Sequence, residues 1–238
     1  MRVQLGGRRY GVAPITCWQL SGSKVMSKRE DKVLIDEWLA RPVCGKYSVG
    51  ILRSAVVDGS ESEPTADRCA YWLLGCMPEG EAEILGLWMS AERTTSVPHQ
   101  MFADLYARGV ENIFLLVDCV SGTAGARPAG TMPHDLGGIR CGRVLALEAS
   151  SLGSSPALLT LRPAVRRAAL LGAERVEAIQ RLVSHAIAGH AAFADEAQAL
   201  AFVAKQLMRA DRRLRQPVSR GRAGRVAPLV SGTSAALC

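Results

Sequence analysis

The order of apolar segments in the first half of the chain limits the folds that it can adopt more than any other feature. Three segments rich in β-branched and apolar residues follow one another, over residues 47–57, 68–77 and 82–89. Pro78-Glu79-Gly80 separates the last two and predicts the turn of a hairpin. A helix is expected over residues 97–108, and a continuously apolar, buried strand over residues 113–117.

This order of strand, strand, strand, helix, strand predicts an α/β fold with a mixed sheet. A hairpin makes its strands antiparallel, whereas a helix that crosses between two strands makes them parallel. The ribonuclease H-like fold has this order, and so do other α/β folds, so the order alone leaves the choice open.

The two halves of the chain differ in charge and composition. Residues 1–120 contain 13 Lys and Arg against 15 Asp and Glu, whereas residues 121–238 contain 16 basic residues against 7 acidic ones. A basic half favours a polyanionic partner, most often nucleic acid. A solvated helix surface with a basic tail would explain the same charge, so both interpretations stand.

The second half is expected to be an irregular linker over residues 121–155, a helical segment over 156–215 and a disordered basic tail over 216–238. Asp195 is expected to cap the last helix, with Gln198 three residues on. We expect the basic residues at the end of this helix and in the tail to contact nucleic acid: Arg209, Arg212, Arg213, Arg215, Arg220, Arg222 and Arg225.

The seven cysteines predict neither a disulfide framework nor a zinc knuckle. Their number is odd, their spacing is irregular and the chain contains no C-x-x-C. A reducing compartment fits this pattern. No apolar run approaches the length of a membrane span. We therefore expect a cytoplasmic protein without membrane contact.

Several short motifs occur in a fixed order between residues 25 and 120. They are Glu37-Trp38, Arg41-Pro42, Tyr47, Ala70-Tyr71-Trp72-Leu73-Leu74-Gly75, Pro78-Glu79-Gly80, Ile84-Leu85-Gly86-Leu87-Trp88, Asp104-Leu105, Arg108-Gly109-Val110 and Val117-Asp118. The ordered series resembles the mutator-type transposases of bacterial insertion sequences. It covers about 40% of the chain.

The resemblance implies a ribonuclease H-like catalytic domain that cleaves and transfers DNA strands at the ends of an insertion sequence. In this family three carboxylates, two Asp and one Glu, hold two divalent ions, Mg²⁺ or Mn²⁺. The implied partner is double-stranded DNA with terminal inverted repeats, in a bacterial nucleoid, and a homo-oligomer is left open. Residues 1–45 then read as an N-terminal helical remnant and residues 46–120 as a partial catalytic core.

The carboxylate pattern of the family is incomplete in this chain. The resemblance places the second carboxylate at Asp118, as a catalytic residue and metal ligand, and the first at Arg53. A unit charge pair at about 4 Å is worth roughly 4 kcal/mol at an effective dielectric constant near 20. Because arginine keeps its proton, Arg53 should repel a metal ion.

Asp58 is the alternative source of the first carboxylate. It lies five residues after Arg53, which places it on the opposite face of a regular strand unless a β-bulge intervenes. The third carboxylate has no identified counterpart, and four residues are candidates by type only: Glu148, Glu174, Glu177 and Glu196.

Three functional hypotheses follow. The first is a transposase-like protein whose copy is truncated and catalytically impaired, through decay or a frameshift near residue 118. The second is a non-catalytic DNA-binding remnant, and the third is a pseudogene product without a selected role.

Overall fold

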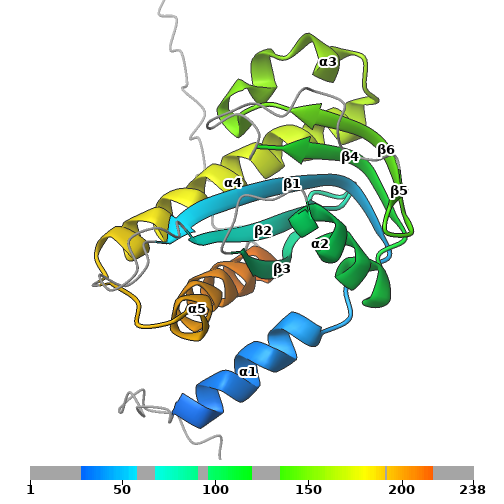
Figure 1. The fold of residues 1–238 in the computed structure, drawn as a ribbon. Helices are drawn as coiled ribbons and strands as arrows, with labels where there is room; N and C mark the ends of the chain where they lie inside the picture. The colour runs from blue at the N-terminus through cyan, green and yellow to red at the C-terminus, as the bar shows by residue number, and fades with distance from the viewer. Residues whose placement is uncertain (1–27, 58–67, 91–95, 120–134, 191, 217–238) are drawn as a thin grey trace, which may run out of the picture.

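The computed structural model describes residues 28–57, 68–90, 96–119, 135–190 and 192–216 (Figure 1). The helices are α1 (Lys28–Ala40), α2 (Ser96–Ala107), η1 (Ala149–Ser154), α3 (Pro156–Leu159), α4 (Pro163–Ala188) and α5 (Glu196–Arg215). The strands are β1 (Lys46–Val57), β2 (Arg68–Cys76), β3 (Ala82–Ser90), β4 (Asn112–Asp118), β5 (Asp135–Leu136) and β6 (Ile139–Ala146).

The strands form one mixed sheet in the order β3-β2-β1-β4-β6-β5. The first three are joined antiparallel, whereas β1, β4 and β6 run parallel. The predicted mixed α/β architecture is therefore confirmed. The hairpin turn is also present, and Gly80 adopts a φ of 93°, which favours glycine at that position.

Strand β6 lies inside the range that the sequence predicted to be an irregular linker. Its side chains are mostly exposed or half-buried, so it lacks the apolar run that marked β4. Gly142 is required where β6 passes β4, because a Cβ atom there would lie 2.6 Å from the carbonyl oxygen of Phe114. Glycine is uncommon inside strands, so Gly142 does not favour a strand in the sequence. In the structure its lack of a side chain allows β6 to pair with β4.

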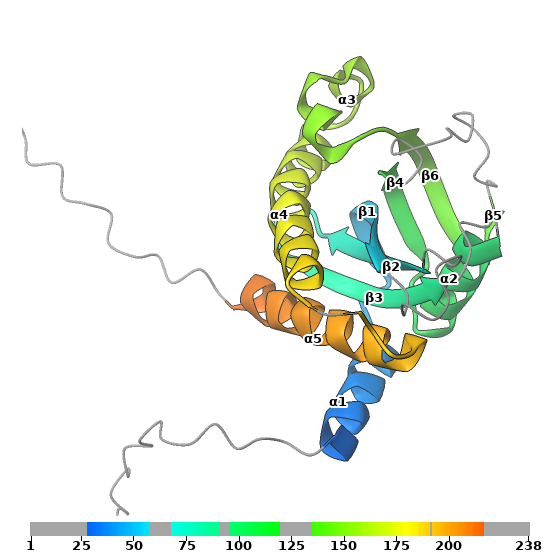
Figure 2. The same cartoon turned by 60° about the vertical axis from the view of Figure 1, so that its left-hand side comes forward.

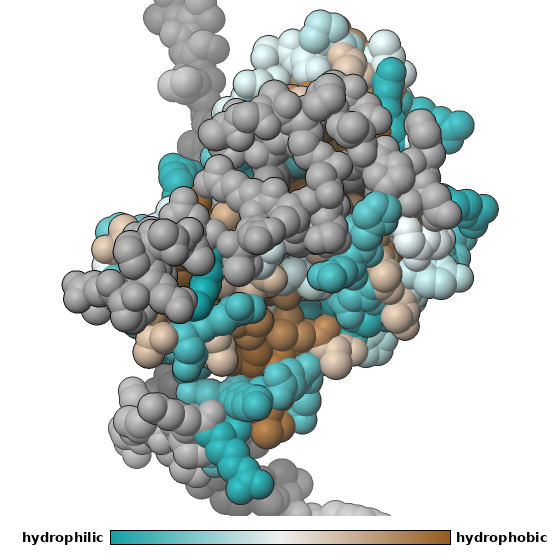
Figure 3. Space-filling view, viewed as in Figure 1, coloured by the Kyte–Doolittle hydropathy of each residue, from teal (hydrophilic) through white to brown (hydrophobic). Residues whose placement is uncertain are grey.

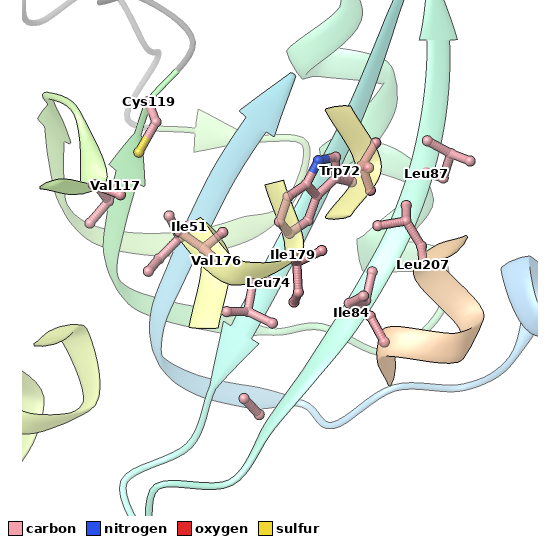
Figure 4. Close-up of a cluster of buried hydrophobic side chains, with 14 of the residues drawn as sticks. Ile51, Trp72, Leu74, Ile84, Leu87, Val117, Cys119, Val176, Ile179 and Leu207 are labelled. Atoms are coloured by element: carbon pink, nitrogen blue, oxygen red, sulfur yellow. The ribbon is translucent and has the colours of Figure 1, made fainter. Parts of the chain in front are cut away.

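Helices cover both faces of the sheet, as Figure 2 shows. Helices α4 and α5 lie on one face over a core that includes Ile51, Trp72 and Val117 (Figure 4). Helix α2 covers the other face, where Phe102 and Leu105 are fully buried. Helix α4 packs on β1 and β2, and α5 packs on β2 and β3.

The predicted cap of the last helix is confirmed. The backbone N–H of Gln198 donates to the Asp195 carboxylate at 2.6 Å, and the Gln198 side chain accepts from Ala194 at 2.7 Å. Val203 and Leu207 are fully buried against the sheet.

None of the helices that the structure describes is both long enough and apolar enough to cross a membrane.

Gly172 sets the distance between α4 and the sheet. A Cβ atom at this position would lie 2.8 Å from Sγ of Cys76 and 2.9 Å from Cδ1 of Ile51, both of which are buried. We expect Gly172→Val to lower the free energy of unfolding by about 2 kcal/mol through overpacking. Urea denaturation would measure the change. Gly153→Ala is the control, because its Cβ would make an ordinary contact of 3.6 Å with Leu170.

Candidate functional site

The carboxyl end of β1 carries a buried arginine that faces α4. Arg53 pairs in the sheet with Trp72 and is 9% exposed. Its Nη1 donates to Oε2 of Glu148 at 3.0 Å, and its Nη2 donates to Oε1 of Glu177 at 2.9 Å. We call Arg53, Glu148 and Glu177 the guanidinium cluster.

The guanidinium cluster joins three elements that lie far apart in the sequence. Arg53 belongs to β1, Glu148 follows β6, and Glu177 lies midway along α4. Next to it, the Gln180 amide donates to the carbonyl oxygen of Ser54 at 3.2 Å. The two glutamate side chains are 34% and 33% exposed, so solvent reaches the carboxylates but scarcely reaches the guanidinium between them.

Asp118 does not share the face of the sheet on which Arg53 lies. It pairs with Leu52 in the parallel register, and Leu52 and Leu116 belong to the core beneath α2. Because side chains alternate along a strand, the register directs Asp118 toward α2 and Arg53 toward α4. The family resemblance places Arg53 and Asp118 at two positions of one metal site, side by side. In the structure they lie on opposite faces of the sheet, because Asp118 pairs with Leu52 rather than with Arg53.

Cys119 lies on the same face as Arg53. Its backbone N–H donates to the carbonyl oxygen of Leu52 at 3.1 Å, which continues the register of β1 and β4 by one residue. Figure 4 shows its thiol on the same side of the sheet as Val117 and Ile51. Sequence reasoning missed Cys119, although counting two residues on from Val117 along the strand would have placed it there.

Burial keeps the Cys119 thiol protonated. Desolvation raises the pKa of Cys119 to about 12, and the positive charge of Arg53 opposes that effect only in part. The thiolate is the form that binds metals and attacks electrophiles. Cys119 is therefore a weak nucleophile near neutral pH.

The residues of this region do not fit the two divalent ions that the family resemblance implies. A guanidinium lies between the two carboxylates, and the Cys119 thiol on the same face has a pKa that burial raises to about 12. Mg²⁺ and Mn²⁺ require several oxygen ligands. Within the described ranges, no group of three or more His, Cys, Asp or Glu side chains could hold a metal ion.

The other residues proposed from the sequence are dispersed. Asp58, Arg220, Arg222 and Arg225 lie outside the described residues. Glu174 and Glu196 are exposed and do not take part in the guanidinium cluster, in contrast to the remaining two acidic candidates.

The arginines of α5 fall into two groups. Arg209, Arg212 and Arg213 are exposed. Arg215 instead donates to Oε2 of Glu83 at 2.6 Å and lies 3.2 Å from the Asp211 carboxylate. Arg215 therefore attaches the end of α5 to the sheet, and nucleic-acid contact remains the expectation for the exposed three.

A second polar cluster uses the first motifs of the series. The buried carboxylate of Asp211 accepts from the Trp38 indole at 3.1 Å and from the backbone N–H of Ile84 at 2.8 Å. Its Oδ2 also lies 3.3 Å from Nη2 of Arg41, whose guanidinium stacks over the Trp38 ring. This cluster fastens α1 and α5 to β3, so these motif residues have a structural role.

A hollow of about 320 Å³ lies elsewhere, between α1, β3 and α2. Its apolar lining is contributed by Leu39, Leu87 and Trp88, and Figure 3 shows brown, apolar surface above α1 on this side. Arg108 borders it but is engaged by the carbonyl oxygen of Arg41 at 3.0 Å and by Asp104 at 3.2 Å. The hollow shares no residue with the guanidinium cluster.

Residues 13–126 match the family model described as Transposase, Mutator family. The resemblance to mutator-family transposases is thus confirmed over this segment. The match includes β1 to β4 and ends before β6, α4 and α5, so Glu148 and Glu177 come from outside the mutator-family segment. A comparison with curated proteins found no match.

Cys119 should resist alkylation in the folded protein. Because its pKa is raised to about 12, the reactive thiolate is scarcely populated at pH 8. We expect iodoacetamide to label the exposed Cys44 well before Cys119, and denaturant to remove the difference. Peptide mass spectrometry would follow both sites. Labelling of Cys119 as rapid as that of Cys44 in the native protein would contradict its placement.

Asp211 should be essential for stability. Asp211→Ala removes the acceptor of two buried N–H groups and leaves the Arg41 guanidinium with Glu83, at 3.8 Å, as its remaining buried carboxylate. We expect a loss of about 3 kcal/mol in the free energy of unfolding. The exposed Arg212→Ala is the matched control on α5, with an expected change below about 0.5 kcal/mol. Equal stability of the two variants in chemical denaturation would refute the assignment.

Proposed function

We propose that this chain is a transposase-like protein that binds double-stranded DNA and does not cleave it by a metal-dependent mechanism. The observation that carries the proposal is the guanidinium cluster beside a mutator-family segment. The match of residues 13–126 to a transposase family is the reason to expect DNA as the ligand. The cluster supplies the reason for the absence of cleavage, because a fixed positive charge occupies the space that a metal ion would need.

The sheet supports a ribonuclease H-like assignment. An antiparallel meander β1-β2-β3 is followed by parallel strands β4 and β6 on the other side of β1. In open α/β sheets the site lies at the carboxyl ends of the parallel strands, and the guanidinium cluster lies at that edge. On this proposal Arg53, Cys119 and Glu177 occupy the three carboxylate positions, with Cys119 in place of Asp118.

The exposed arginines of α5 support DNA as the polyanion. Arg209, Arg212 and Arg213 lie in the last turns of this helix and are exposed. Lys and Arg side chains of this kind bind the phosphates of the DNA backbone, and each such contact releases counter-ions from the DNA. The expected ligand is a duplex that carries the terminal inverted repeats of an insertion sequence.

Reversing two charges on α5 should weaken DNA binding. For Arg212→Glu/Arg213→Glu we expect lower affinity for the duplex and a smaller salt dependence, with the slope of log K against log salt reduced by about 1 to 2. Fluorescence anisotropy at several salt concentrations would measure both. Incubation of the same duplex with Mg²⁺ or Mn²⁺ should yield no strand cleavage.

Arg167→Glu/Arg181→Glu on α4 is the matched control, because it changes the net charge equally at exposed positions of another helix. An equal loss of affinity in both double variants would indicate nonspecific charge attraction. Metal-dependent cleavage by the wild-type chain would refute the proposed function. Absence of any binding would leave the pseudogene hypothesis.

A further inference from the structure

Three buried polar atoms beneath α4 lack a hydrogen-bond partner within the protein. They are Nε of Arg53, Nε1 of Trp72 and Oε1 of Gln180, and no group in the described part of the chain bonds to any of them. Trp72 is fully buried, so bulk solvent does not reach its indole N–H. A buried donor or acceptor that stays unsatisfied is costly, so three such atoms in one region indicate a shared partner.

The two donors lie side by side on the α4 face of the sheet. Arg53 and Trp72 are directly paired residues of the antiparallel strands β1 and β2, and the side chains of such a pair share one face with Cβ atoms about 5 Å apart. Figure 4 shows the Trp72 ring in the core beneath α4, with its nitrogen toward the carboxyl end of β1. Both N–H groups therefore belong to the space between the sheet and this helix.

Gln180 brings the acceptor to the same space from α4. Its amide nitrogen donates to the carbonyl oxygen of Ser54 and to Oγ of Ser184, each at 3.2 Å. These bonds fix the orientation of the amide, because an oxygen in that place would face the Ser54 carbonyl. Glu177, which accepts from Arg53 at 2.9 Å, precedes Gln180 by three residues and so lies on the same face of the helix. The free oxygen of Gln180 is thus held over β1, next to Arg53.

The chemistry of the three atoms selects their partner. Two are donors and one is an acceptor, so the partner must both accept and donate hydrogen bonds. One guanidinium with two carboxylates, Glu148 and Glu177, has a formal charge of −1, which disfavours an anion, and two N–H groups disfavour a cation. A small neutral molecule that accepts two hydrogen bonds and donates one is water.

We propose that one water molecule is bound between the sheet and α4, where it accepts from Trp72 and Arg53 and donates to Gln180. The water joins β1, β2 and α4 in the way that a direct side-chain hydrogen bond would. Both donors lie in the mutator-family segment and the acceptor lies beyond it, so the water connects the two parts of the chain. The inference concerns the folded protein alone and does not rest on DNA binding.

The test observes the indole N–H groups of ¹⁵N-labelled protein by water-selective NMR. A water bound at Trp72 should give a cross-peak between the indole proton and water, with NOE and ROE of opposite sign, whereas hydrogen exchange with solvent gives equal signs. Trp38 is the control within the same chain, because its buried indole N–H donates to Asp211 at 3.1 Å and should show no such peak. Trp72→Phe assigns the signal by removing it.

Gln180→Met tests the acceptor. The variant keeps the length of the side chain but lacks the amide oxygen, so we expect it to lose the Trp72 cross-peak and to leave the Trp38 signal unchanged. Arg181→Met, at the next and exposed position of α4, is the matched control and should keep the peak. A crystal structure of the wild-type chain gives an independent measurement, with one ordered water expected within about 3.2 Å of all three atoms.

Each result decides for or against the bound water. A Trp72 peak that is lost in Gln180→Met, together with the ordered water in the crystal, would support it. No peak at Trp72 in the wild type, an unchanged peak in Gln180→Met, or an equal peak at Trp38 would overturn it. If Gln180→Met does not fold, the crystal structure of the wild type decides, and no water bonded to the three atoms would refute the proposal.

Discussion

The pairing of the Arg53 guanidinium with two acids connects parts of this fold that lie far apart in the sequence. Arg53 lies on a strand of the mutator-family segment, and its partners Glu148 and Glu177 come from the half of the chain beyond it. The buried charge of Arg53 is paired with both acids, because an unpaired buried charge is costly. The segment and the later helices are thereby held in one arrangement.

The same charge decides the chemistry that this edge of the sheet can support. Ligands of α/β proteins bind at the carboxyl ends of parallel strands. In this chain that edge holds the salt bridges of Arg53 with Glu148 and Glu177. The neutral Cys119 thiol beside it offers no further negative charge. Both carboxylates of the cluster engage the Arg53 guanidinium, so the cluster links β1 to α4 and to the segment that follows β6.

A second polar cluster shows how motif residues can serve the fold. Trp38 and Arg41 belong to the motifs that carried the family resemblance, yet both contact Asp211 of α5. They fasten the helix that bears the exposed arginines onto β3. The first motifs and the basic helix are consequently parts of one structural unit. Arg215 at the end of that helix belongs to the same unit, because it forms ion pairs with Glu83 and Asp211.

Local periodicity and residue type predicted strands β1 to β4, helix α2, the capped last helix α5 and the positive charge at position 53. The sequence did not reveal β6, whose half-exposed residues carry no apolar period, nor did it select Glu148 and Glu177 among four acidic candidates. Those points, and the faces on which Asp118 and Cys119 lie, follow from the packing of segments that are distant in the sequence. Strand register and helix docking depend on contacts between residues about 100 positions apart, and no local pattern encodes them.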